Sequence, residues 1–271
     1  MKITVPKGAC DTHMHFYDQA VPAAPGTFLP GHFTVAHYRE QIQKGLGVER
    51  VIVVQPNAYR DDNTVTLNAM KELGWSAKGV AVVTPDVPDA ELDRLTKAGI
   101  CAVRIMTLHG GMLQFDVMDA VMARVHPFGW HANIQLDGRE LPKYEAQIKR
   151  LPGKFVIDHT GKFLEPVSTD HEAFKSLLRL VDTGRCWIKL SAPYETSKTG
   201  APKYEDVGRL AKALVKRAPE RMLWASNWPH PSERKNPPDD EVLLDLLADW
   251  APDDATRKKI LVDNPAELYA F

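Results

Sequence analysis

Three histidines lie at the ends of strand-like segments and are the side chains most able to carry chemistry. The first segment ends in DTHMH, which contains His13 and His15, and the sixth ends in DHTG, which contains His159. Side chains alternate along a strand, so Asp11, His13 and His15 are expected to share one face. An imidazole can accept a proton, donate one or bind a metal near neutral pH. The pattern predicts a site formed by the three histidines, although hydrogen-bonded core histidines would give the same letters.

The eighth strand-like segment ends in SNWPH, which places Asn227 where a carboxylate could complete such a site. A side-chain amide has no basic lone pair at neutral pH, so Asn227 cannot take a proton from water. We expect it to orient a substrate instead. A turn asparagine is the alternative interpretation.

Arg104 lies inside the fourth strand-like segment, and leaving a buried guanidinium without a partner costs several kcal/mol. Its planar fork suits a carboxylate, so we expect it to hold an anionic substrate, helped by Lys162 or Arg60. A structural salt bridge is the alternative. The remaining candidates for substrate contacts are hydrogen-bonding side chains close to strand ends: Asn57, Tyr59, Gln135, Ser191, Tyr194 and His230.

The elements that must position these residues are eight short apolar segments with helix-like stretches between most of them. The segments are rich in Val, Ile, Leu or aromatic residues, as buried parallel strands are. They cover residues 9–14, 50–55, 79–84, 101–106, 130–136, 155–159, 186–191 and 222–226. The helix-like stretches cover 34–46, 62–73, 88–98, 113–128, 140–150, 170–183, 204–217, 239–250 and 254–262. A glycine follows five of these stretches, as expected of the left-handed residue that ends a helix.

This alternation predicts an α/β fold, a (β/α)8 TIM barrel in which residues 1–271 form a single domain. A doubly wound open sheet is the competing arrangement. Such a sheet usually has a glycine-rich phosphate turn after its first strand, and DTHMHFYD is not one. In a barrel, function collects at the carboxyl ends of the strands, which is where the candidate residues lie.

Composition limits the possible partners and the compartment. The formal net charge of −1 provides no broad field for nucleic acid or an anionic membrane. No apolar run approaches the roughly 20 residues that span a bilayer, and the first residues do not read as a secretory signal. The three scattered cysteines fit reduced thiols, so we expect a cytoplasmic protein that binds neither membrane nor nucleic acid. The oligomeric state stays open.

The segments DTHMH, VIVVQPNAY, VRIM, IDHTGK, IKLSAPY and LWASNWPHP, in this order, resemble the amidohydrolase superfamily. They are most similar to the branch that contains the 2-pyrone-4,6-dicarboxylate lactonases and the galactarolactone isomerases. The resemblance spans nearly the whole chain, down to the closing NPAELY. It implies that His13, His15, His159 and Asn227 are catalytic and that Arg104 binds a substrate carboxylate. In the hydrolases the residue at the position of Asn227 is an aspartate that takes a proton from the attacking water.

The asparagine at this position changes the reaction that the resemblance implies. General base assistance to water is worth roughly 10²–10⁴-fold. A hydroxyl of the substrate itself can still attack, because well-placed intramolecular groups reach effective molarities of about 10⁵–10⁸ M. The resemblance therefore implies an isomerase of a sugar-diacid lactone, from D-galactaro-1,5-lactone to the 1,4-lactone. A lactone hydrolase with a histidine base, or an inactive barrel that binds such lactones, are the alternatives.

No metal cofactor is expected, although many members of the superfamily hold zinc or a pair of metals. Arg104 would repel a metal ion, the fifth segment ends in Asn133 and Gln135 instead of histidine, and Asn227 is not a carboxylate. One zinc ion held by His13, His15 and His159 is the alternative.

Overall fold

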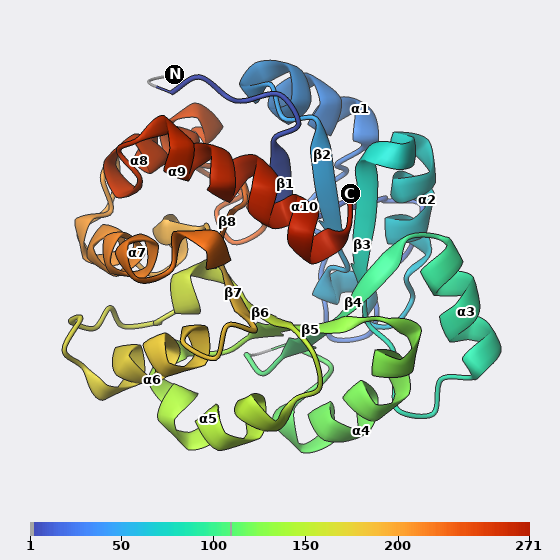
Figure 1. Ribbon diagram of the computed structural model, residues 1–271. Helices are drawn as coiled ribbons and strands as arrows, with labels where there is room; N and C mark the ends of the chain where they lie inside the picture. The colour runs from blue at the N-terminus through green and yellow to red at the C-terminus, as the bar shows by residue number, and fades with distance from the viewer. Residues whose placement is uncertain (1–2, 109) are drawn as a thin grey trace.

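The computed structural model describes residues 3–108 and 110–271. They form a single sheet of eight parallel strands in the order β1 to β8, with helices outside it (Figure 1). The first and last strands meet, because Asn227 N donates to the His13 carbonyl and His15 N to the Trp228 carbonyl, both at 2.9 Å. The predicted (β/α)8 barrel is therefore confirmed. The strands are β1 (Cys10–Met14), β2 (Arg50–Val54), β3 (Ala77–Ala81), β4 (Ile100–Met106), β5 (His131–Gln135), β6 (Phe155–Ile157), β7 (Cys186–Leu190) and β8 (Met222–Trp224).

The α-helices follow the predicted stretches, except for α10, which was not predicted. They are α1 (Val35–Tyr38), α2 (Thr64–Leu73), α3 (Asp89–Lys97), α4 (Phe115–Val125), α5 (Leu141–Arg150), α6 (Glu172–Val181), α7 (Glu205–Arg217), α8 (Asp240–Trp250), α9 (Asp254–Lys258) and α10 (Asn264–Tyr269). α1 and α9 continue as π-helical turns over Arg39–Lys44 and Lys259–Asp263. The glycines after the predicted stretches all have positive φ, as expected: Gly47, Gly74, Gly99, Gly129 and Gly184. No helix in the described part of the chain is long and apolar enough to cross a membrane.

Three strands differ from the prediction by two or more residues at an end. β3 begins and ends earlier than the predicted 79–84, because the Asn63 side chain bonds both the N–H and the carbonyl of Val82. β6 and β8 stop short of His159 and Asn227, whose φ angles are 54° and 60°. A left-handed residue cannot continue a strand, so both side chains lie in the turns that follow.

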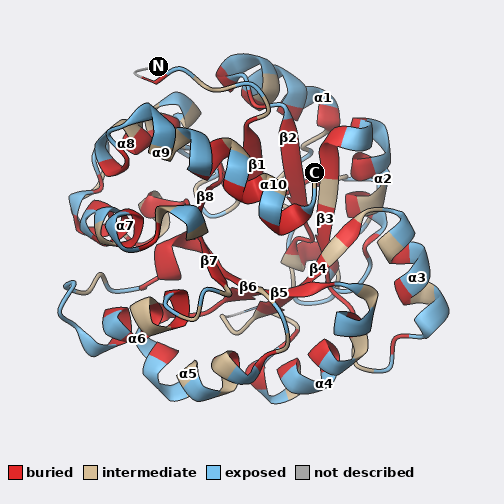
Figure 2. Ribbon diagram, in the orientation of Figure 1, coloured by how far each residue is buried: buried red, intermediate tan, exposed pale blue. Residues whose placement is uncertain are grey.

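The inside of the barrel is apolar at the amino ends of the strands and polar at their carboxyl ends. Cys10, Ile52, Val80, Trp187 and Leu223 belong to an inner apolar cluster that also includes Leu268 and Tyr269 of α10. α10 therefore closes the amino-terminal end of the barrel, and it crosses the front of the ring in Figure 1. The strands are buried along their length except at Lys78, Cys101 and Met106, which are of intermediate burial (Figure 2).

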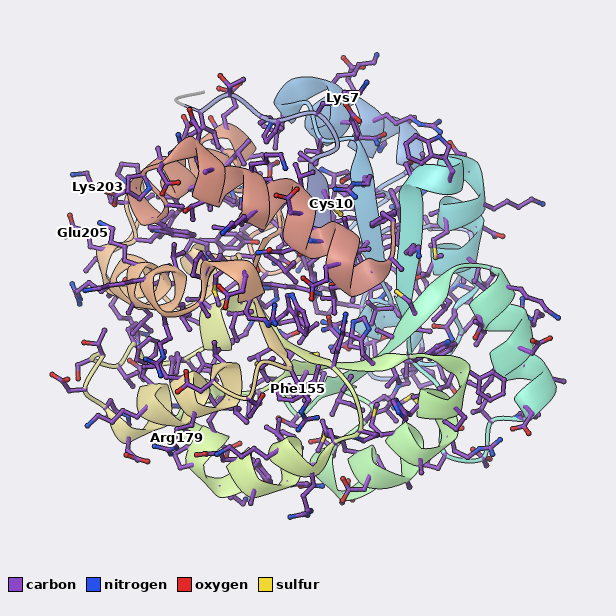
Figure 3. All side chains as sticks on the ribbon, in the orientation of Figure 1. Lys7, Cys10, Phe155, Arg179, Lys203 and Glu205 are labelled. Carbon is purple, nitrogen blue, oxygen red and sulfur yellow. The ribbon has the colours of Figure 1, made fainter. Side chains whose placement is uncertain are left out.

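Side chains fill the centre of the ring, while charged ones such as Arg179 and Lys203 surround it (Figure 3). The polar layer at the carboxyl ends of the strands contains His13, Arg104 and Lys189, all at most 5% exposed. Burial of so many polar groups is costly unless they are hydrogen-bonded to one another or kept for function.

Asp11 does not share a face with the two histidines of β1, so this prediction is wrong. Its carboxylate accepts hydrogen bonds from Tyr38 of α1 at 3.1 Å and from the Ser226 hydroxyl at 2.5 Å. The pairing of β1 with β2 is irregular between Asp11 and Met14. Such an irregularity breaks the alternation on which the prediction depended.

Candidate active site

A cavity of about 360 Å³ opens at the carboxyl ends of the strands. Seven of the predicted site residues line it: His15, Asn57, Arg104, Gln135, His159, Lys162 and Asn227. Other lining residues were not predicted, among them Tyr17, Phe28, Met106, Glu195 and Ser232. The cavity is large enough for a small sugar acid and carries several polar groups that converge from different strands.

A directed chain of hydrogen bonds fixes the protons of His13 and His15. The Val54 carbonyl can only accept, so His15 carries its proton on Nδ1, 2.7 Å from that oxygen. At the other end the Lys189 ammonium can only donate, and its Nζ lies 3.1 Å from His13 Nδ1. His13 therefore carries its proton on Nε2 and donates it to His15 Nε2 at 3.2 Å. Both rings are neutral, and the lone pair of each is already occupied.

Burial reinforces the neutral state of these two rings. It lowers the pKa of His13 to about 4, against the attraction of Asp158. Burial and the neighbouring His13 hold the pKa of His15 well below its ordinary value. Protonating His15 would also place two N–H groups head to head between the Nε2 atoms, and protonating His13 would place an N–H against the Lys189 ammonium.

A buried ion pair lies behind the histidines. Lys189 Nζ contacts Asp158 Oδ1 at 3.1 Å and Asn133 Oδ1 at 2.6 Å, and Asn133 Nδ2 donates to Asp158 Oδ2 at 2.7 Å. Burial alone would raise the pKa of Asp158, but Lys189 and His13 outweigh it and hold that pKa well below its usual range. Sequence reasoning did not single out Lys189. The signal was its position two residues before Ser191, on the same face of β7.

His159 faces the cavity with a different partner. Its Nδ1 lies 2.8 Å from Ser191 Oγ, which in turn contacts the Lys189 carbonyl at 3.5 Å. Donation of the serine hydroxyl to that carbonyl leaves the ring donating from Nδ1, with its lone pair on Nε2. Burial and the nearby Lys162 ammonium hold the pKa of His159 well below its ordinary value.

A second chain of hydrogen bonds fixes the orientation of the Asn227 amide. His230 Nδ1 lies 2.9 Å from the Tyr194 hydroxyl, and its Nε2 lies 3.3 Å from the Asp240 carboxylate without a hydrogen bond between them. The Tyr194 oxygen then accepts from Asn227 Nδ2 at 2.9 Å. The amide nitrogen is thereby directed toward Tyr194, and the carbonyl oxygen is left for the cavity. Residue 227 presents an acceptor that is not a base.

Arg104 brings a positive charge to the cavity. Its described partners are neutral oxygens, the Gln55 carbonyl at 2.7 Å and Gln135 Oε1 at 2.9 Å, and its Nε has none among the described residues. Burial lowers the pKa of Arg104 from its usual value. A buried guanidinium held by neutral groups beside a cavity is suited to binding an anion. Because these partners are neutral, the hydrogen bonds of Arg104 do not support the alternative of a structural salt bridge.

Lys162 and Glu195 form an ion pair in the wall of the cavity, and each side chain is 10% exposed. Glu195 Oε1 also accepts from the Ser232 hydroxyl at 2.9 Å and from Asn227 Nδ2 at 3.4 Å. The sequence analysis missed Glu195, the last residue of a 3-10 turn, Pro193–Glu195, that follows β7. The only feature of the sequence that could have indicated Glu195 is its acidic side chain soon after the end of β7.

Two predicted substrate contacts lie away from the cavity. The Tyr59 hydroxyl accepts from Asp18 N at 2.8 Å and donates to the Asp18 carbonyl at 3.0 Å, so it anchors a loop. Arg60 is exposed and its guanidinium donates to the Pro25 carbonyl at 3.1 Å. The backbone of Arg60, with φ of 49° and ψ of −117°, ends the 3-10 turn that follows β2. Contrary to the prediction, neither Tyr59 nor Arg60 is placed to contact a substrate in the cavity.

Four further predicted residues stand behind the cavity wall instead of in it. They are His13 behind His15, Ser191 behind His159, and Tyr194 with His230 behind Asn227. His13, Ser191 and Tyr194 each bond a lining side chain, and His230 bonds Tyr194, so they position the site without lining the cavity.

Left-handed backbone conformations concentrate around this site. His159, Thr160, Lys162, Ala192, Asn227 and His230 all have positive φ without being glycine. Such conformations cost about 1–3 kcal/mol each and cluster at functional sites, where the surrounding structure enforces them. The strain lies in the turns that follow β6, β7 and β8.

The histidines are also the residues that could hold a metal ion. Ligand atoms of His13, Asp158 and His159 lie within 4.8 Å of one another, and imidazoles are ligands that zinc prefers. A ligand imidazole must offer a lone pair, but His13 Nε2 carries a proton and its Nδ1 faces Lys189 Nζ. Lys189 also supplies Asp158 with the positive charge that a cation would bring. With these tautomers His13 offers no free lone pair to a metal ion.

Comparison with known proteins identifies the family to which this chain belongs. The model of the amidohydrolase family matches residues 10–271. D-galactarolactone isomerase of Agrobacterium fabrum is 37% identical over 268 residues, 97% of this chain and 91% of that protein. A 2-pyrone-4,6-dicarboxylate hydrolase of Comamonas testosteroni is 33% identical over 280 residues, 98% of this chain and 91% of the relative. An apo crystal structure from Agrobacterium tumefaciens superposes with a TM-score of 0.93 at 36% identity, covering 98% of this chain and 97% of that one.

Proposed function

The chain belongs to the amidohydrolase family, and we propose that it is a lactone isomerase that converts D-galactaro-1,5-lactone into D-galactaro-1,4-lactone. The relative that is a D-galactarolactone isomerase supports this substrate. The observation that carries the proposal is the orientation of Asn227, whose amide oxygen is left to the cavity by the bonds to Tyr194 and Glu195. A carboxamide there cannot activate water.

The reaction needs only a change of ring oxygen. The hydroxyl on C4 attacks the carbonyl carbon C1, and the bond between C1 and the ring oxygen on C5 then breaks. The attacking oxygen loses one proton and the leaving oxygen gains one, so no water is consumed. An intramolecular hydroxyl at an effective molarity of about 10⁵–10⁸ M outcompetes water at about 55 M.

The lining residues supply binding and orientation for this reaction. Arg104 holds the remote carboxylate of the lactone, because its guanidinium meets only neutral oxygens in the protein. The Asn227 carbonyl oxygen accepts a hydrogen bond from a substrate hydroxyl and orients it. His159 and His15 line the cavity beside Arg104, and neutral rings there add no positive charge that would compete with Arg104 for the carboxylate.

We also propose that the reaction requires no metal ion, supported by the tautomers of His13 and His15 and by the Lys189 ammonium. Activity should survive extensive chelation, and elemental analysis should find no stoichiometric metal. Activity lost on chelation and restored by zinc would overturn this part of the proposal.

A lactone hydrolase is the second candidate, favoured by the Glu195 carboxylate in the cavity wall and by the 2-pyrone-4,6-dicarboxylate hydrolase relative. Incubation with galactaro- and glucaro-lactones, followed in real time by NMR, separates the two. We expect the 1,4-lactone as first product. A ring-opened diacid formed first would favour the hydrolase, and binding without turnover would favour an inactive barrel.

The reaction is proposed to take place in the cytoplasm. Cys10, Cys101 and Cys186 are free thiols in the structure. Burial raises the pKa of Cys101 to about 12, so this thiol stays protonated and unreactive.

A further inference from the structure

The isomerisation proposed above needs one group that takes a proton and one that returns it. The two oxygens concerned sit on neighbouring carbons of the sugar and are both bonded to C1 in the tetrahedral intermediate. The acid and the base must therefore lie side by side. Among the described residues of the cavity wall, Lys162 and Glu195 meet this requirement, because they contact each other directly.

The other titratable groups of the cavity wall are poorly suited to the task. The His15 lone pair is occupied by the His13 N–H, and Arg104 does not release its proton. Burial holds Tyr17 in its phenol form. His159 could accept a proton, but it would then become a further buried cation beside Lys162. Glu195 becomes neutral when it accepts a proton. Unlike His159, it therefore does not become a new buried cation.

Glu195 also has room for a substrate hydroxyl. A carboxylate offers about four acceptor positions. Ser232 and Asn227 donate to Oε1, and Lys162 donates to Oε2. One position on Oε2, next to the Lys162 ammonium, remains for the hydroxyl that attacks.

We propose that the Lys162–Glu195 ion pair is the proton relay of the lactone isomerisation, with Glu195 as general base and Lys162 as general acid. Glu195 Oε2 takes the proton of the C4 hydroxyl as its oxygen bonds to C1. Lys162 Nζ gives a proton to the oxygen on C5 as its bond to C1 breaks. Glu195 is then a neutral acid and Lys162 a neutral amine, and one proton transfer across their contact restores the ion pair. No proton is gained from or lost to solvent.

This relay rests on the proposed function, and it assigns Lys162 a role other than the carboxylate binding expected from the sequence. The first test is Glu195→Gln, which keeps the shape of the side chain but removes the base. We expect kcat with galactaro-1,5-lactone to fall about 10²–10⁴-fold with little change in KM. We expect kcat of the wild type to decline at acidic pH and kcat of Glu195→Gln to lack this decline, while Glu195→Asp should retain part of the activity.

The matched control is Glu165→Gln, since Glu165 is 61% exposed and pairs with Lys198 at the surface. It should leave kcat and the pH profile unchanged. Calorimetric binding of linear galactarate to Glu195→Gln would show that the variant still folds and binds. The relay would be overturned by a Glu195→Gln variant that binds galactarate and keeps kcat within a few-fold of wild type. It would also be overturned if kcat of this variant still declined at acidic pH.

The second test concerns the acid. Lys162→Ala should lose activity to a similar extent and regain part of it with added ethylammonium, which can occupy the space of the missing side chain. A variant that binds galactarate but is not rescued by amine would contradict the role of Lys162. A wild-type protein that isomerises no lactone would refute the proposed function itself, which is a different outcome from either failure.

Discussion

The amide at residue 227 decides which nucleophile the active site favours. An aspartate there would lose the donor to Tyr194 and stand beside Glu195, whose Oε1 lies 3.4 Å from Asn227 Nδ2. It would nevertheless supply a carboxylate in the position that the hydrolases use. We predict that Asn227→Asp forms ring-opened diacid and isomerises more slowly, measured by NMR of the product mixture. The variant should hydrolyse better when combined with Glu195→Gln, because the repulsion between two carboxylates is removed. Product that remains only the ring isomer in both variants would contradict this account of Asn227.

Arg104 should determine the preference for an acidic substrate. Hydrogen bonds to charged groups contribute about 1.5–3 kcal/mol, so Arg104→Met should raise KM for galactarolactone roughly 10- to 150-fold. The control is a substrate, an aldonolactone with a hydroxymethyl group in place of the remote carboxylate. Its KM should change little in the variant. Equal losses for both lactones would mean that Arg104 only supports the structure.

The sequence identified the cavity residues that stand at strand ends, but not those that depend on how a loop turns. His15, His159, Arg104 and Asn227 follow from strand positions and residue types. Glu195 reaches the cavity because Ala192 adopts a left-handed conformation and starts a 3-10 turn. No local pattern in the letters predicts that turn, since alanine rarely has positive φ.

At the scale of elements, the barrel has a catalytic end and a structural end. α10 fills the structural end, where Tyr269 is 1% exposed and packs with the inner apolar cluster. The alternation of strands and helices predicted the barrel, yet it did not predict this closure, because helix 254–262 was expected without α10. Because the two ends are separate, we expect Tyr269 to contribute to stability and the active-site residues to contribute to catalysis.

Removing the Tyr269 ring should therefore weaken the fold without changing the chemistry. Tyr269→Ala is expected to lower the free energy of unfolding by roughly 3–5 kcal/mol, as large aromatic truncations do. Its kcat at a temperature where it is folded should match wild type. Tyr269→Phe is the control: its hydroxyl has no hydrogen-bond partner among the described residues, so its loss should cost little stability. A several-fold loss of kcat in either variant would argue against two independent ends.

At the scale of the whole molecule, the neutral histidines make stability depend on pH. His13 and His131 have pKa values lowered by burial to about 4 and about 3, and the pKa values of His15 and His159 lie well below normal. Well below pH 6.5 these four histidines of the unfolded chain bind nearly four protons that the folded protein does not. Burial raises the pKa of Asp11 to about 6, so the folded protein there binds one proton that the unfolded chain lacks. The net difference is about three protons, and stability falls as the pH falls.

The expected slope is about 4 kcal/mol per pH unit near pH 5, since each proton contributes about 1.4 kcal/mol per unit. Urea unfolding at pH 7, 6 and 5 measures it. His13→Gln should reduce the slope by about one proton. A free energy of unfolding that stays constant from pH 7 to pH 5 would show that the histidines are not held neutral.

The central claim is that the substrate's own hydroxyl, and not water, attacks the lactone carbonyl. The most direct measurement is the reaction of galactaro-1,5-lactone in water enriched in ¹⁸O, with the product analysed by mass spectrometry against an enzyme-free control. The account predicts a 1,4-lactone that contains no ¹⁸O beyond the control, because no solvent oxygen enters the product. One ¹⁸O atom in each product molecule would contradict it.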